Sequence, residues 1–144
     1  MPISSYADHS YFKLYLADIG LLRKMSKLPA SSILEKSEIF KEFKGALTEN
    51  YALNELIYIS GDVPYYWKSN NSAEVDFIIQ FEIDIIPIEV KSERNVKARS
   101  LAEYIKKYNP KVAIKTSMKN ISGDEVKNIP LYLIWNIYKL IRRN

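Results

Sequence analysis

Two short stretches hold the residues of this sequence best suited to chemistry: Glu74-Val75-Asp76-Phe77 and Ile88-Glu89-Val90-Lys91. Both alternate polar and apolar residues, the pattern of a β-strand with one polar face. Because successive side chains of a strand point to opposite faces, Glu89 and Lys91 are expected on the same side. The two stretches therefore offer carboxylates and an ammonium group on neighbouring strands, which are groups that bind metal ions and phosphate.

The register between these strands decides which acidic groups meet. If the chain turns at residues 82–83, counting back along the hairpin places Asp76 opposite Glu89, and Glu74 opposite Lys91. Carboxylates side by side repel each other unless a cation neutralises them. We therefore predict a Mg²⁺ or Mn²⁺ site at Asp76 and Glu89, with Lys91 activating water or stabilising charge on phosphate. The plainer alternative is an ordinary ion pair between Glu74 and Lys91, worth about 0.2–1 kcal/mol.

Glu49 is a further candidate, contributed by a helix. It shares a helical face with Leu53 and Leu56, and a carboxylate among apolar neighbours needs a reason. We predict that Glu49 points into the same pocket as an additional metal or water ligand, or pairs with Lys91. The alternative is a place at the rim of the core.

Hydrophobic periodicity and turn residues predict the elements that position these groups. Asp18 is expected to cap a short helix, and Pro130 to place the last strand at or near a sheet edge. The expected elements are a helix over 38–59, strands over 65–68, 74–81 and 85–91, a helix from the Ser100–Glu103 capping box to Asn109-Pro110, strands over 112–116 and 129–134, and a helix over 135–142. The order is α-β-β-β-α-β with extensions at both ends, an α/β fold.

Length and composition bound the class of protein. With 144 residues, 47% hydrophobic and 26% charged, the chain fits one globular unit, with a leading segment over 1–37 and the main domain over 38–144. Cysteine is absent and His9 is the only histidine, which excludes thiol chemistry and argues against a Ser-His-Asp arrangement. We find no signal peptide and no apolar run of membrane-spanning length, and we expect a cytoplasmic protein.

A net charge of +4 and a pI near 9.1 are compatible with nucleic acid as partner. Arg94, Lys97 and Arg99 follow the acidic site, and Lys68 ends the first strand, so all four are candidates for binding phosphate. A solvated loop is the alternative for the first three. The aromatic run at 65–67 can stack on unpaired bases or simply pack against the fold.

The order of elements and motifs resembles the PD-(D/E)XK nuclease superfamily: a helix with Glu49, three strands carrying Asp76 and Glu89-Val90-Lys91, then a helix and a strand. More narrowly, five segments resemble a domain of unknown function that typically forms the C-terminal part of bacterial and archaeal AAA-type ATPases. These segments are 14–22, 45–50, 66–67, 74–77 and 88–92.

This resemblance implies a restriction-endonuclease-like fold, with the acidic cluster at the edge of a mixed central sheet flanked by helices. Together with the four polar residues Glu49, Asp76, Glu89 and Lys91, it leads to the hypothesis of a Mg²⁺-dependent endonuclease, a hydrolase. The alternative is a catalytically inactive module that binds DNA or a protein partner of an ATPase, and a third possibility is an oligomerisation domain using 135–142. The sequence has no G-x-x-x-x-G-K-[ST] motif, so a P-loop ATPase module is expected in cis or in trans.

Overall fold

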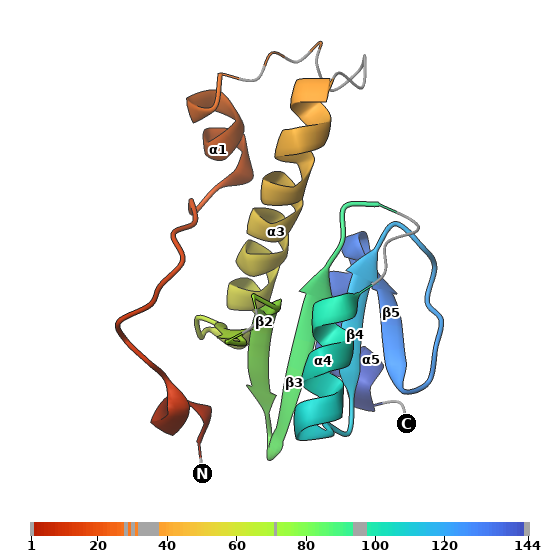
Figure 1. Ribbon diagram of the computed structural model, residues 1–144. Coiled ribbons are helices and arrows are strands. Elements are labelled where there is room, and N and C mark those ends of the chain that lie inside the picture. The colour runs from red at the N-terminus through yellow and green to blue at the C-terminus, as the bar shows by residue number, and fades with distance from the viewer. Residues whose placement is uncertain are drawn as a thin grey trace.

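The computed structural model of the chain describes residues 2–27, 29, 31, 38–70, 72–93 and 98–142, with backbone alone for 38, 39, 41 and 42. The fold is mixed α/β, with helices on both faces of a central sheet (Figure 1). The elements are η1 (Ile3–Tyr6), α1 (Ile19–Met25), α3 (Glu38–Ser60), β1 (Tyr65–Lys68), β2 (Glu74–Phe81), β3 (Asp84–Val90), α4 (Arg99–Tyr108), β4 (Ala113–Ser117), β5 (Val126–Pro130), η2 (Leu131–Asn136) and α5 (Ile137–Arg142).

The sheet of the described residues has five strands in the order β1-β2-β3-β4-β5. The first three strands pair antiparallel, whereas β3–β4 and β4–β5 pair parallel. The hairpin register is the predicted one: Phe81 pairs with Asp84, and the ladder continues to Phe77 opposite Ile88. Glu82 adopts a φ of 55°, which allows the chain to reverse within two residues. The ladder ends at the pair that Ile88 forms, and Asp76 and Glu89 are the next residues of the two strands.

Two hydrophobic clusters join the layers. One lies between the sheet and α4 and contains Val75 and Leu101. The larger cluster, on the side of α3, η2 and α5, contains Leu56, Ile88 and Ile137. Figure 1 shows α4 in front of the sheet and α5 behind it. Ile137, a residue of the predicted contact face for oligomers, therefore packs within the chain, whereas Trp135 of the same face is 50% exposed.

Most predicted elements are confirmed within one residue at each end, including the N-cap at Asp18 and the edge position of β5. The predicted capping box is wrong, because α4 begins at Arg99 after Ala98, whose side chain donates or accepts no capping hydrogen bond. The predicted strand over 129–134 is also wrong beyond Pro130, since Leu131–Asn136 forms a 3-10 helix that places Ile134 in the core. A short apolar run does not by itself distinguish a strand from a helical turn.

No helix in the described ranges combines the length and the apolar character needed to cross a membrane.

Candidate functional site

Glu89 is the most deeply buried charged residue of the site. It lies on β3 with 3% of its surface exposed, and its Oε1 accepts from Lys91 Nζ at 2.5 Å. Among the residues that the structure describes, none donates a hydrogen bond to Oε2, although this atom is buried. The backbone N–H of Lys91 donates to the carbonyl of Thr116 at 2.8 Å, which holds the end of β3 against β4. Burying a carboxylate oxygen without a partner is costly, so this atom is a candidate ligand for a cation.

Asp76 lies on β2, the strand next to that of Glu89, at a position where the pairing of β2 with β1 is irregular. Between the pairs Tyr65–Ile78 and Trp67–Val75, β1 has one residue and β2 has two, so β2 carries a β-bulge at Asp76 and Phe77. The carboxylate Oδ2 of Asp76 accepts the backbone N–H of Val90 at 2.7 Å. The side chain of Asp76 thus bonds to the backbone of β3 at the position where β2 is bulged.

The electrostatics of this pair disfavour two negative charges. Burial and then the charge of Glu89 raise the pKa of Asp76 to about 7, while the bond from Val90 opposes the shift. Burial also raises the pKa of Glu89, against the opposing effect of Lys91. Both acids lie at the end of β3, since Glu89 is part of this strand and Asp76 bonds to Val90. Neighbouring acids with raised pKa values are typical of sites that bind cations or transfer protons.

Glu49 of α3 belongs to the same electrostatic cluster, since its charge contributes to the raised pKa values of both Asp76 and Glu89. Its Oε1 accepts from Lys13 Nζ at 3.1 Å and from the hydroxyl of Tyr15. The predicted pairing of Glu49 with Lys91 is thus replaced by contacts to the N-terminal segment. Glu74 likewise pairs with Lys13.

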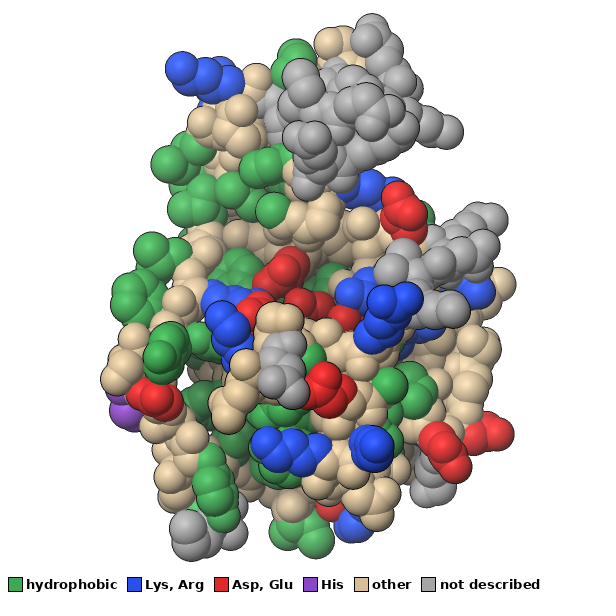
Figure 2. Space-filling model, viewed as in Figure 1, with side chains coloured by type: hydrophobic (Ala, Val, Ile, Leu, Met, Phe, Trp, Pro, Cys, Tyr) green, Lys and Arg blue, Asp and Glu red, His purple; other side chains and the backbone are tan. Residues whose placement is uncertain are grey.

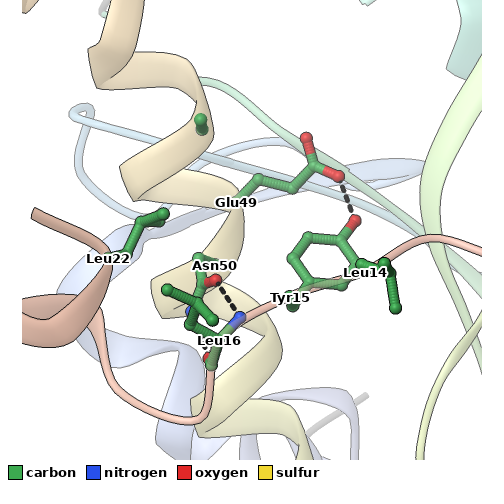
Figure 3. A pocket seen from close by; sticks show the side chains of 7 residues that line it. Leu14, Tyr15, Leu16, Leu22, Glu49 and Asn50 are labelled. Atoms are coloured by element: carbon green, nitrogen blue, oxygen red, sulfur yellow. Dashed lines mark hydrogen bonds between the residues drawn. The ribbon is translucent and has the colours of Figure 1, made fainter. Parts of the chain in front are cut away.

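Residues 11–18, here called the strap, bring Lys13 and Tyr15 to the site. Figure 1 shows this segment running in extended form along one side of the molecule. Asn50 on α3 clamps the strap, because its side chain both accepts from the N–H of Leu16 at 2.9 Å and donates to its carbonyl at 2.8 Å. Asn54 donates to the carbonyl of Ala17 at 3.2 Å. Figure 3 shows the bond of Asn50 to Leu16 and that of Tyr15 to Glu49, and all four residues line the same pocket.

Lys13 is the residue of the site that sequence reasoning missed. Its ammonium lies between Glu49 and Glu74 and 5.1 Å from the ring centre of Tyr66. Burial disfavours the charged form of Lys13, but Glu74 and Glu49 outweigh this effect and raise its pKa. No local pattern marks this lysine, because it meets Glu49 from 36 residues away.

Figure 2 shows acidic side chains gathered in the middle of one face, with basic side chains on both sides. Of the residues predicted to bind nucleic acid, Lys68 and Arg99 are exposed, at the end of β1 and the start of α4. Arg94 and Lys97 lie outside the described residues. Trp67 packs edge-on against Tyr104, with ring centres 5.3 Å apart, which favours the packing interpretation of that aromatic residue.

The donor set defines what kind of ion fits. In the described part of the chain, no three His, Asp or Glu side chains are arranged to hold a metal ion together. Asp76 and the unpartnered Oε2 of Glu89 offer a smaller, all-oxygen set. Mg²⁺ suits such a set, since it is usually bound by one or two carboxylates and keeps several waters.

Fold and site together define a mixed α/β domain with a buried acidic cluster between two lysines. The family described as a domain of unknown function (DUF4143) matches residues 44–134, and the chain belongs to this family. The match includes Glu49, Asp76, Glu89 and Lys91, whereas Lys13 precedes it. Comparisons with curated proteins and with solved structures gave no match.

Proposed function

We propose that this chain is a metal-dependent phosphodiesterase domain of the PD-(D/E)XK nuclease-like class that hydrolyses nucleic acid. The observation that carries the proposal is the buried carboxylate of Glu89, paired through one oxygen with Lys91 and unpartnered at the other among the described residues, next to Asp76. The order of α3, β1, β2, β3, α4 and β4 supports a restriction-endonuclease-like core. The resemblance of the sequence to that superfamily supports the same fold.

Each residue has a defined part in this proposal. Asp76 and Glu89 are the ligands for Mg²⁺ or Mn²⁺, and Glu49 contributes negative charge to the same cluster as an auxiliary group. When bound, such an ion would polarise the phosphate and lower the pKa of a coordinated water. The ammonium of Lys91, held by its pair with Glu89, would stabilise the charge that develops on phosphate oxygens.

Nucleic acid is the substrate class that the charge distribution supports. The net charge is +4, and exposed Lys68 and Arg99 are candidates to contact the backbone phosphates, together with Arg94 and Lys97. The sequence resemblance further supports a P-loop ATPase module as partner, in cis or in trans. Such a partner would supply the nucleotide hydrolysis for which this sequence has no motif.

The decisive experiment is cleavage of labelled single-stranded, duplex and branched DNA, with RNA in parallel, in Mg²⁺ and in Mn²⁺. Asp76→Asn and Lys91→Ala are compared with the wild type and with Asp84→Asn, which changes an acid at the other end of the same hairpin. We expect metal-dependent products that both site variants lose by about 100-fold or more and the control retains. Circular dichroism confirms that each variant is folded.

The second candidate is a non-catalytic module that binds a protein or DNA partner of an ATPase. It is favoured by the apolar side chains of the strap, since Tyr11, Phe12 and Leu14 expose 68%, 74% and 87% of their surface. Absence of cleavage on every substrate, or cleavage that persists in both site variants, would support this module over the nuclease.

A further inference from the structure

Lys13 supplies a positive charge to the acidic cluster, beside two of its carboxylates. Its ammonium contacts Glu49 on α3 and Glu74 on β2, two carboxylates from elements that meet only in the folded chain. The side chain of Lys13 is only 22% exposed, and those of Glu49 and Glu74 are 27% and 35% exposed. The three groups therefore form a partly buried cluster rather than a solvated surface pair.

The strap holds Lys13 in this position by contacts of its own. Asn50 bonds to both the N–H and the carbonyl of Leu16, and its side chain is buried. Tyr15, two residues after Lys13, donates its hydroxyl to the same oxygen of Glu49 that Lys13 contacts. The backbone near Lys13 and the carboxylate of Glu49 are thus held by other bonds, so less ordering is left to the ion pair itself.

We propose that Lys13 is a built-in cation of the site that keeps Glu49 and Glu74 from binding metal, so that the protein binds a single divalent ion at Asp76 and Glu89. This inference rests on the proposed function for the location of that ion. The four carboxylates then fall into two pairs. Glu49 and Glu74 are neutralised by Lys13, whereas Asp76 and Glu89 bind the metal ion. Lys13 is thus a positioning residue that sets the metal stoichiometry.

The test is the number of Mn²⁺ ions bound per chain, measured by electron paramagnetic resonance and by calorimetry on the full chain. We expect one ion in the wild type and two in Lys13→Met, because the freed carboxylates then form a second, weaker site. Lys13→Arg keeps the charge and should bind one ion. Lys44→Met, which removes a lysine from the same helix as Glu49, is the charge-matched control and should also bind one.

Further variants separate this inference from the proposed function. The second ion of Lys13→Met should disappear in the double variant Lys13→Met/Glu49→Gln, and the wild-type ion should disappear in Asp76→Asn. If Lys13→Met binds no more ions than the wild type, or if Glu49→Gln alone removes the wild-type ion, the assignment of Lys13 is wrong. A third result is that the wild type binds no ion, Lys13→Met binds one, and the double variant Lys13→Met/Glu49→Gln binds none. In that case the role of Lys13 stands and the proposed metal site at Asp76 and Glu89 fails.

Discussion

The two ends of the β2–β3 hairpin carry the same residue types in opposite surroundings. At the turn, Asp84 pairs with Lys111 at 2.8 Å and Glu82 with Arg142 at 3.5 Å, and all four side chains are at least 38% exposed. At the open end, the side chain of Glu89 is only 4% exposed in its pair with Lys91. The two ends therefore differ in the burial of their acidic side chains and not in the types of residue that they carry.

Burial changes what a charge pair does. Exposed ion pairs contribute about 0–1 kcal/mol, since water and salt screen them. A buried carboxylate pays a desolvation cost that raises its pKa, and it then depends strongly on its cation. We expect the largest effect from the buried ion pair and the smallest at the turn, with the strap, which lies outside the hairpin, between them.

Lys91→Met should destabilise the protein strongly, because it leaves Glu89 buried without its cation. We expect a loss of about 3 kcal/mol in the free energy of unfolding, at the low end for a broken buried pair since Lys91 keeps some exposure. Urea denaturation at pH 8 with EDTA measures it. Lys111→Met, the control at the turn, should change stability by less than about 1 kcal/mol. Equal losses in the two variants would contradict the contrast between the ends.

Asp76 should make the metal-free protein less stable as the pH rises. Its folded-state pKa is about 7, above the ordinary value of 3.8, so the folded chain keeps a proton that the unfolded chain has released. The stability contribution of Asp76 is therefore greatest below about pH 4 and falls as the pH rises to about 7.

Urea denaturation across this pH range in EDTA checks the sign. Asp76→Asn should remove this part of the pH dependence and be more stable than the wild type above pH 7. Asp84→Asn should leave the profile in place. A wild-type protein that becomes more stable over this interval because of Asp76 would contradict the buried position of its carboxylate.

We expect the two hydrogen bonds of Asn50 to hold the strap against α3. Asn50→Ala removes two hydrogen bonds to Leu16 and is expected to cost about 1–3 kcal/mol. Amide hydrogen exchange at Leu16 should accelerate in the same variant. Asn54→Ala removes a single, longer bond to Ala17 and should cost less. If exchange at Leu16 is unchanged in Asn50→Ala, the clamp does not hold the strap.

The smallest effect is expected at the turn. A double-mutant cycle of Asp84→Asn and Lys111→Met should give a coupling energy of about 0–1 kcal/mol that decreases with added salt. A coupling energy of about 3 kcal/mol, the loss expected for Lys91→Met, would show that the exposed pair is as strong as the buried one.

Much of the fold could be predicted from the sequence because its signals are local. The apolar spacing of α3, the turn at Gly61 with its φ of 74°, and the alternation along β2 and β3 each act within a few residues. The hairpin register followed from a two-residue turn, and it ends one pair before Asp76 and Glu89, whose charges interact. The strand expected after Pro130 failed because the burial of Ile134, a tertiary contact, determined its conformation.

The sequence by itself determined which carboxylates stand on neighbouring strands, since two strands joined by a tight turn have little freedom of register. Only the tertiary structure decided how those carboxylates behave. The bulge at Asp76, the burial of Glu89 and the contact of Lys13 with Glu49 depend on segments far apart in the chain. Desolvation and long-range pairing act on a side chain through its three-dimensional surroundings, and these exist only once the strap, α3 and the sheet have packed together.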